Sequence, residues 1–460
     1  MKIVTFLAIL TSFFQGCTRN TSNKDFNIVL ITIDALRPDH LSCYGYKRRT
    51  SPTIDKIAKQ GVIFKNAVAP STWTAPSMVS LFTSTSPINH GVIDRRVNNG
   101  KVYDQQVFSD ELVTLTEVLQ KNGYTTFGVA SNLHLGESLG FARGFDFFEC
   151  LSFLPAPSVN KALFAWEDEI KKSNKFFLWI HYIDPHFPYH PRKPWINYYT
   201  SDRGKTENIA KLSIPALWER YVELTQDNQT QTKQEVTDFV NSLLALYDSE
   251  INYIDYYLRS VIQKFKLNKN TLIVITSDHG EGFFEHRILG HTYTLYQETI
   301  HIPLIVKLPR STQGEIFSTQ VNLVDIFPSI LQLLNIDPPE HVVGKPFLSE
   351  DGIRKGLSEK EGRDCYFSEL GSFKSKAILT DDWKYIYNYD DETDQLYNLK
   401  KDPLETNNLA EKETVRCRNL KARMFEWVSN AKKYPVKEQC YSFTLEEKEK
   451  LEALGYIETQ

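Results

Sequence analysis

Two acidic residues stand just after apolar, β-branched segments. Asp34 follows residues 26–33 (FNIVLITI), and Asp278 follows residues 271–276 (TLIVIT) after one serine. Such runs are typical of strands buried inside a sheet, and ligands of open α/β sheets bind beyond the carboxyl ends of the strands. We therefore expect both carboxylates at one edge of a sheet, where they form a candidate metal site. The alternative for Asp34 is a residue that only caps the end of its strand.

A hydroxyl group marks a second candidate position. Thr74 lies in residues 73–77 (WTAPS), and Pro76 is well tolerated in the first turn of a helix. Thr74 is therefore expected at a helix N-terminus, where free N–H groups and the helix dipole stabilise an anion. The alternative is that Thr74 caps the helix and does no chemistry.

The elements that must position these residues alternate along the chain. Strands are predicted over residues 26–33, 124–130, 175–179, 271–276 and 302–307, and helices over residues 51–59, 112–122, 234–265 and 323–334. This alternation predicts an α/β fold with a large, mostly parallel or mixed central sheet flanked by helices on both faces. After about residue 335, short strand-like pieces in polar loops predict a small antiparallel C-terminal subdomain.

Length and charge limit the possible functions. The 460 residues correspond to two or three domains at ~150 residues each. A net charge of −4 gives no reason to expect a nucleic-acid partner. The 13% aromatic content favours a folded, globular protein.

The chain begins with a pattern typical of an export signal. Residues 3–14 are apolar but shorter than the about 20 residues that span a bilayer. Gly16-Cys17 then resembles the cleavage site of bacterial lipoproteins, so we expect an exported protein anchored by acylated Cys17 on the periplasmic or cell-surface side of a membrane. Ordinary secretion is the alternative. The expected divisions are a signal peptide (1–17), a catalytic domain (24–345) and a C-terminal subdomain (346–460).

A series of motifs then resembles one protein family in order along almost the whole mature chain. They include residues 27–34 (NIVLITID), 51–55 (SPTID), 64–67 (FKNA), 90–92 (HGV), 185–188 (PHFP), 276–281 (TSDHGE), 303–306 (PLIV), 324–328 (VDIFP) and 396–399 (LYNL). The chain resembles the sulfatase family of the alkaline phosphatase superfamily, whose members hydrolyse or transfer phosphate and sulfate esters. The resemblance implies an alkaline phosphatase-like fold.

The resemblance places Thr74 at the nucleophile position. Sulfatases carry Cys-x-Pro-Ser-Arg there, and their cysteine or serine is oxidised to formylglycine. Threonine is not a known substrate for that oxidation, and Met78 replaces the arginine, so no formylglycine is expected. Threonine attacks directly in phosphodiesterase branches of the superfamily, which implies the same role for Thr74.

The resemblance also implies a ligand set for one divalent metal ion, formed by Asp34, Thr74, Asp278 and His279. Sulfatases typically have two adjacent aspartates after the first strand and Asp-Asn after the later one. Here Ala35 replaces the second aspartate and His279 replaces the asparagine. An imidazole suits Zn²⁺ or Mn²⁺ better than Ca²⁺, although the sequence leaves all three open.

Four further residues are implied as catalytic. Asn132 takes the place of a family lysine, and His134 is retained beside it. His186 matches the family histidine that contacts the ester, and His291 falls near another family lysine. Either His186 or His291 would protonate the leaving group. Lone histidines are most often structural, which is the alternative for each.

These residues predict a metal-dependent hydrolase that cleaves phosphate esters, diesters rather than monoesters, through Thr74. The alternatives are a sulfuric ester hydrolase, a catalytically inactive binding protein, and a phosphoryl-group transferase. The expected substrate is a small-molecule, glycan or lipid ester. Neither the oligomeric state nor the identity of the metal follows from the sequence.

Overall fold

The computed structural model describes residues 25–93, 95–98, 101–226, 230–267, 269–349, 352–353, 366–370, 375–380, 382–437 and 441–453. The expected signal peptide, Cys17 and the tether lie outside the described residues, so they stay predictions. Among the described helices, none combines the length and the apolar character needed to cross a membrane.

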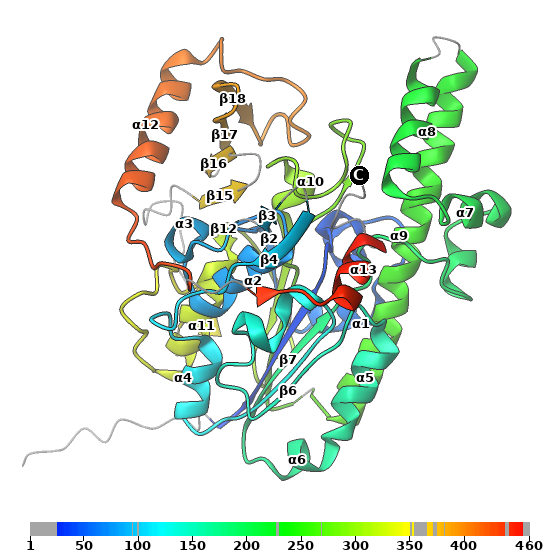
Figure 1. Ribbon diagram of the computed structural model, residues 1–460. Coiled ribbons are helices and arrows are strands. Elements are labelled where there is room, and N and C mark those ends of the chain that lie inside the picture. The colour runs from blue at the N-terminus through cyan, green and yellow to red at the C-terminus, as the bar shows by residue number, and fades with distance from the viewer. Residues whose placement is uncertain are drawn as a thin grey trace, which may run out of the picture.

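A large mixed sheet lies at the centre of the described chain (Figure 1). Its order is β12 (Glu315–Asn322), β2 (Val62–Val68), β11 (His301–Lys307), β8 (Thr271–Thr276), β1 (Asn27–Ile33), β7 (Phe176–Tyr182), β5 (Thr125–Ala130) and β6 (Phe147–Cys150). β1 pairs in parallel with β7 and β8, and β5 is parallel to β7, whereas β11 runs antiparallel to β8. The predicted α/β fold class is therefore confirmed.

Alternating side chains of β1 show that helices cover both faces of the sheet. Ile28 and Leu30 pack into one core, and Val29, Ile31 and Ile33 pack into another. The first core includes α2 (Thr74–Thr83), α4 (Leu115–Lys121) and α11 (Ile326–Leu334). The second includes α1 (Pro52–Ala58), α5 (Ala156–Ala165) and α9 (Thr230–Lys264). Burial of both faces explains why residues 28–31 form an unbroken apolar run within β1.

The described part of the polar stretch 200–233, which has no strand-like pattern, is largely helical. It contains α7 (Arg203–Ile209) and α8 (Ile214–Gln226), and α8 stands beside α9 as a helical hairpin (Figure 1). Shorter helices are α3 (Pro87–His90), α6 (Glu167–Lys172) and α10 (Gln297–Ile300).

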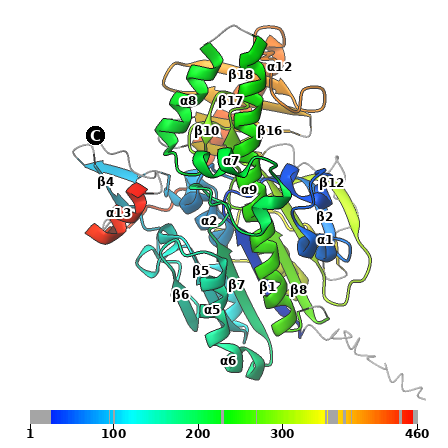
Figure 2. The same cartoon turned by 90° about the vertical axis from the view of Figure 1, so that its right-hand side faces the viewer.

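The C-terminal region forms the predicted antiparallel sheet. Its strands are β15 (Tyr366–Leu370), β16 (Ser375–Leu379), β17 (Trp383–Asn388) and β18 (Thr393–Asn398), and α12 (Thr414–Asn430) packs against it. The chain then returns to the main body, because β19 (Tyr441–Ser442) pairs with β4 (Lys101–Gln105), which also pairs with β3 (Arg95–Asn98). α13 (Leu445–Ala453) follows beside β4 (Figure 2). Small two-stranded pairs are β9 (Gly282–Phe283) with β10 (Leu289–Gly290), and β13 (Leu348–Ser349) with β14 (Gly352–Ile353).

Candidate active site

Polar residues gather where the parallel central strands end. Asp34 directly follows β1, and Asp278 and His279 follow the neighbouring β8. Asn132 comes after β5, and His181 lies near the end of β7. Because these strands are parallel neighbours, their carboxyl ends meet at one edge of the sheet. The edge therefore collects side chains that are up to 245 positions apart, as the sequence predicted for the two aspartates.

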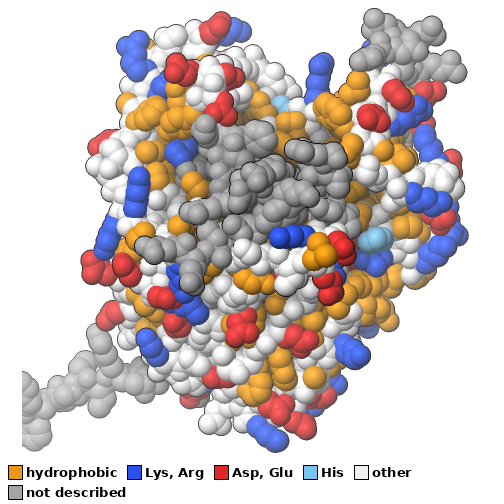
Figure 3. Space-filling model, in the orientation of Figure 1, with side chains coloured by type: hydrophobic (Ala, Val, Ile, Leu, Met, Phe, Trp, Pro, Cys, Tyr) orange, Lys and Arg blue, Asp and Glu red, His pale blue; other side chains and the backbone are white. Residues whose placement is uncertain are grey.

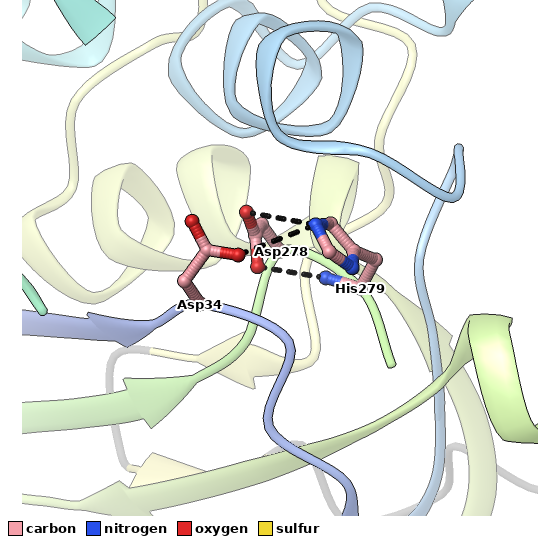
Figure 4. Close-up of side chains that lie close together, drawn as sticks. All are labelled: Asp34, Asp278 and His279. Atoms are coloured by element: carbon pink, nitrogen blue, oxygen red, sulfur yellow. Dashed lines mark hydrogen bonds and ion pairs between the residues drawn. The ribbon is translucent and has the colours of Figure 1, made fainter. Parts of the chain in front are cut away.

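Two carboxylates and one imidazole form a compact cluster (Figure 4). His279 Nε2 lies 3.4 Å from Asp34 Oδ1 and 3.5 Å from Asp278 Oδ2. All three side chains are completely buried, and these same three atoms have no hydrogen-bond partner among the described residues. His279 Nδ1 lies 2.8 Å from the Gly280 carbonyl oxygen, which accepts the Nδ1 proton and leaves Nε2 facing the carboxylates. Three buried, unpartnered ligand atoms within 4.8 Å of one another fit a divalent cation.

The electrostatics of the cluster also favour a cation. Burial disfavours charge on the His279 ring, but the Asp278 and Asp34 carboxylates outweigh burial and raise the pKa of His279 to about 9. Burial, together with repulsion from Asp34, raises the pKa of Asp278. Burial acts in the same direction on Asp34, yet hydrogen bonding to His181 and the neighbouring histidine charges hold the Asp34 pKa well below its usual value. The two acids therefore attract positive charge to this position.

Thr74 is the first residue of α2, and the N-cap position before it belongs to Trp73. The Thr74 hydroxyl donates to Asp34 Oδ2 at 3.4 Å and accepts from Asn132 Nδ2 at 3.3 Å. Its side chain is completely buried. Thr74 is not the N-cap residue, and its side chain forms no capping hydrogen bond. The alternative that Thr74 only caps the helix therefore does not fit the structure.

Asn132 and His181 support the same carboxylate oxygen. Asn132 Nδ2 donates to Asp34 Oδ2 at 2.8 Å, and His181 Nε2 lies 3.3 Å from that atom. The other ring nitrogen of His181 is 2.8 Å from Thr32 Oγ1. These contacts fix the orientation of Asp34 so that Oδ1 is directed to His279.

Two more histidines border the cluster. The His291 ring centroid lies 4.2 Å from that of His279 and 4.9 Å from that of His186. Glu281 Oε1 is 3.0 Å from His291 Nδ1, and the other oxygen of Glu281 accepts from Tyr189 at 3.1 Å. Burial lowers the pKa of His186 to about 4 and raises that of Glu281 to about 7. His186 is therefore a neutral imidazole near pH 7.

His134 is positioned differently from the other candidates. Its Nδ1 lies 2.5 Å from Gln105 Oε1, and Gln105 Nε2 donates to the His134 carbonyl oxygen. Its ring packs edge-on against Trp73 and Phe443. The His134 ring thus contacts Gln105, Trp73 and Phe443, and its catalytic role stays a prediction.

Two of the positions that depart from the family pattern, Met78 and Ala35, have clear structural consequences. Met78 is completely buried in the core formed with α4 and α11. Ala35 adopts a left-handed backbone with φ of 55°, and its N–H donates to Asp278 Oδ1 at 3.2 Å. The backbone of Ala35 therefore orients one metal-ligand candidate without supplying a carboxylate.

Three residues of this region were not identified as site residues from the sequence: His181, Glu281 and Tyr189. His181 ends an apolar strand as Asp34 does, and that signal was available. Glu281 lies in the family motif at residues 276–281. Its contact with His291, ten residues later, forms only because the chain folds back through β9 and β10. Nothing in the local sequence around Tyr189 indicates its hydrogen bond to Glu281.

A hydroxyl at a helix start lies beside buried metal-ligand candidates at the carboxyl edge of an α/β sheet, an arrangement suited to the hydrolysis of ester bonds. The chain belongs to the sulfatase family: the family model described as "Sulfatase" matches residues 26–336. A second model, described as "N-sulphoglucosamine sulphohydrolase, C-terminal", matches residues 280–433.

Individual proteins agree with this assignment. A protein named "Sulfatase" from Formosa agariphila is 22% identical over 424 residues, which cover 82% of this chain and 82% of that protein. A protein solved in complex with its substrate D-glucosamine-2-N,6-O-disulfate superposes with a TM-score of 0.70 at 18% identity, covering 88% of this chain and 99% of that chain. The phosphonate monoester hydrolase of Agrobacterium radiobacter gives a TM-score of 0.67 at 19% identity, covering 88% of this chain and 95% of that chain. The fold therefore occurs in proteins named for sulfate esters and for phosphonate esters.

Proposed function

We propose that this protein hydrolyses phosphate esters, diesters rather than monoesters, with Thr74 as the nucleophile. The observation that carries the proposal is the Thr74 hydroxyl, held at the start of α2 between Asp34 and Asn132 where sulfatases place the formylglycine precursor. A hydroxyl on a rigid helix terminus, facing a carboxylate, needs no oxidation to attack an ester.

The residues divide the reaction into two steps. Thr74 Oγ1 loses its proton to water as it attacks phosphorus, and the bond from phosphorus to the leaving oxygen breaks. The departing alkoxide takes a proton and leaves as an alcohol. Water then attacks the phosphothreonine, which returns the hydroxyl to Thr74 and releases the product. A divalent ion held by Asp34, Asp278 and His279, with Thr74 beside them, would supply Lewis-acid stabilisation of the charge that develops on phosphoryl oxygen.

We assign the proton transfer at the leaving group to His291 rather than His186. The Glu281 carboxylate accepts from His291 Nδ1 and so orients the ring, which is the arrangement expected of a general acid or base. His186 has its Nδ1 against the Phe187 carbonyl and is kept neutral by burial. Because the single proton of the neutral His186 ring is on Nδ1, its Nε2 has no proton to give to the leaving oxygen.

Charge favours a diester over a monoester. A phosphodiester carries one negative charge near neutral pH and a monoester up to two. The positions where the family has lysine or arginine hold Asn132, Met78 and His291, and Met78 is turned into the core. With so few fixed cations, the site is matched to a monoanion. A cavity of about 860 Å³ beside His186 has room for the second ester group.

Sulfate esters are the second candidate, because they are also monoanions and because relatives of this chain are named sulfatases. Formylglycine hydrate can expel sulfate by collapsing to the aldehyde, whereas threonine sulfate lacks that route. A panel of chromogenic phosphate monoesters, phosphate diesters and sulfate esters, each with Zn²⁺, Mn²⁺ or Ca²⁺, separates the candidates. We expect the highest kcat/KM with a diester and Zn²⁺ or Mn²⁺. Turnover of sulfate esters alone would overturn the phosphate assignment.

We also propose that acylated Cys17 anchors the protein to a membrane. The apolar h-region followed by Gly16-Cys17 supports this proposal. Cys17→Ser should move the protein from salt-washed membranes to the soluble fraction, because the serine variant cannot be acylated. Cell fractionation with immunodetection measures the effect, and Cys43→Ser is the control that keeps the anchor. Equal retention of both variants on washed membranes would contradict lipidation.

A further inference from the structure

A second cavity lies at the opposite end of the sheet from the Asp34 cluster. This foot groove has a volume of about 730 Å³ and is bordered by α1, the end of α9, the segment before β8 and the segment after β11. The segment before β8 leads into the amino end of that strand. The segment after β11 lies at the same end of the sheet, because β11 runs antiparallel to β8. β1 has seven residues, so about 20 Å separates the groove from the catalytic edge.

The charged residues of the foot groove are all cations. Lys56, Arg259, Lys269 and Arg310 line it, and no aspartate or glutamate does. All four side chains are exposed, and within the described part of the chain none forms an ion pair with a carboxylate. This composition is unusual for a chain with a net charge of −4. On the face in Figure 3, by contrast, acidic and basic side chains are interspersed.

The remaining polar groups of the groove suit an anion as well. Hydroxyl and amide side chains supply the other polar lining, and the apolar Ile57 and Ile262 make up the rest: Thr53, Gln60, Gln263, Asn270, Ser311 and Thr312 are the polar members. The buried carboxylate of Asp255, one turn before Arg259 on α9, already accepts from the N–H groups of Thr53 and Ile54 at 2.8–2.9 Å. Asp255 is thus engaged in holding α1 and does not neutralise the exposed cations.

The foot groove also lies where the membrane tether joins the fold. Asn270 lines the groove, and its side chain donates to the Asp25 carbonyl oxygen at 2.6 Å. Asp25 is eight residues after Cys17, and eight extended residues reach at most about 28 Å. A lipid on Cys17 therefore keeps the bilayer surface within reach of the four cations.

We propose that the foot groove binds the phosphate-bearing headgroups of an anionic phospholipid surface. Lys and Arg near such a surface are attracted to its negative potential, and the four unpaired cations give the protein one preferred orientation. The catalytic edge then faces away from the bilayer. This deepens and rests on the proposed function: the site takes esters on soluble molecules or glycans rather than on membrane lipids.

The test uses the mature chain from residue 18 onwards, so that neither the apolar signal peptide nor lipidation contributes. Co-sedimentation is measured at low salt with vesicles of phosphatidylcholine alone and of phosphatidylcholine with phosphatidylglycerol. We expect binding only to the anionic vesicles. The triple change Arg259→Gln, Lys269→Gln and Arg310→Gln should weaken that binding on the order of 10²-fold, because each cation near the surface contributes about fivefold.

A charge-matched control separates the groove from net charge. Lys401→Gln, Lys412→Gln and Arg418→Gln remove three exposed cations, one on α12 and two from the segment between β18 and α12. α12 lies at the far end of the molecule from the starts of β1 and β8 (Figure 2). This variant should bind vesicles as the parent does. Equal weakening by both triple variants, or equal binding to neutral vesicles, would overturn the proposal.

Two further readouts keep the alternatives apart. If inorganic phosphate displaces the protein from vesicles far better than chloride at equal ionic strength, the groove is a site for free phosphate and not for a bilayer. Hydrolysis of a soluble chromogenic ester should be unchanged in the groove variant. Loss of vesicle binding with normal hydrolysis in the groove variant therefore shows that the groove binds the membrane independently of catalysis. If no phosphate ester is hydrolysed in the ester panel, the proposed function is wrong, but the result for the groove is unaffected.

Discussion

Thr74→Ala should lower turnover on the order of 10³-fold or more while leaving the fold intact. The change removes the one hydroxyl that faces Asp34 and Asn132, so only binding and electrostatic stabilisation remain to act on the ester. Thr74→Ser should keep much of the activity, because it retains the hydroxyl at the start of α2. Turnover and melting temperature are measured on the same preparation of each variant.

The control for this experiment lies on the same helix. Thr83 is also completely buried in α2, and its hydroxyl donates to the Val79 carbonyl oxygen at 2.7 Å and accepts from the Thr85 hydroxyl at 2.6 Å. Thr83→Ala should lower the melting temperature, at a cost of about 2 kcal/mol for the two lost hydrogen bonds, without changing turnover. If Thr74→Ala behaves like Thr83→Ala, with a lower melting temperature and near-normal turnover, Thr74 is not the nucleophile.

The fold could be predicted from the sequence where a strand is buried on both faces, because such a strand appears in the sequence as a continuous apolar run. Residues 272–275 are apolar without interruption because both faces of β8 are covered, and the predicted strand 271–276 coincides with the observed one. The end of β7 was less clear, since Tyr182 is buried but His181 interrupts the apolar pattern. His181 is a polar residue that contacts Asp34. The predicted strand therefore ends at residue 179, before this site residue, whereas β7 continues to Tyr182.

The candidate site was predictable where a site residue directly follows the end of a predicted strand. Asp34 and Asp278 needed only the rule that parallel strands end at a common edge. Contacts made by irregular segments were not predictable in this way. His291 reaches Glu281 only after the chain turns back through β9 and β10, and His134 is directed to Gln105 by a segment that carries no periodic pattern. Such geometry depends on long-range packing that local sequence does not encode.

Asp278→Asn should weaken metal binding by at least about 10²-fold and abolish activity at low metal concentration. The asparagine Oδ1 can still accept from the N–H groups of Ala35 and His279, so the local fold is preserved. What disappears is a charged oxygen directed at His279 Nε2. Metal content by mass spectrometry after gel filtration gives the first readout, and recovery of activity at high metal concentration gives the second.

The matched control is Asp255→Asn, which neutralises another buried aspartate that accepts from backbone N–H groups, outside the Asp34 cluster. It should retain the metal.

Chelation should remove the activity of the parent protein and lower its melting temperature, because a ligand that binds only the folded state stabilises it by about 2.7 kcal/mol at a hundredfold excess over Kd. Chelation should leave the melting temperature of Asp278→Asn unchanged. Full turnover by the metal-free parent would refute metal dependence, and an equal loss of metal from Asp255→Asn would show that the effect does not belong to the Asp34–Asp278–His279 cluster.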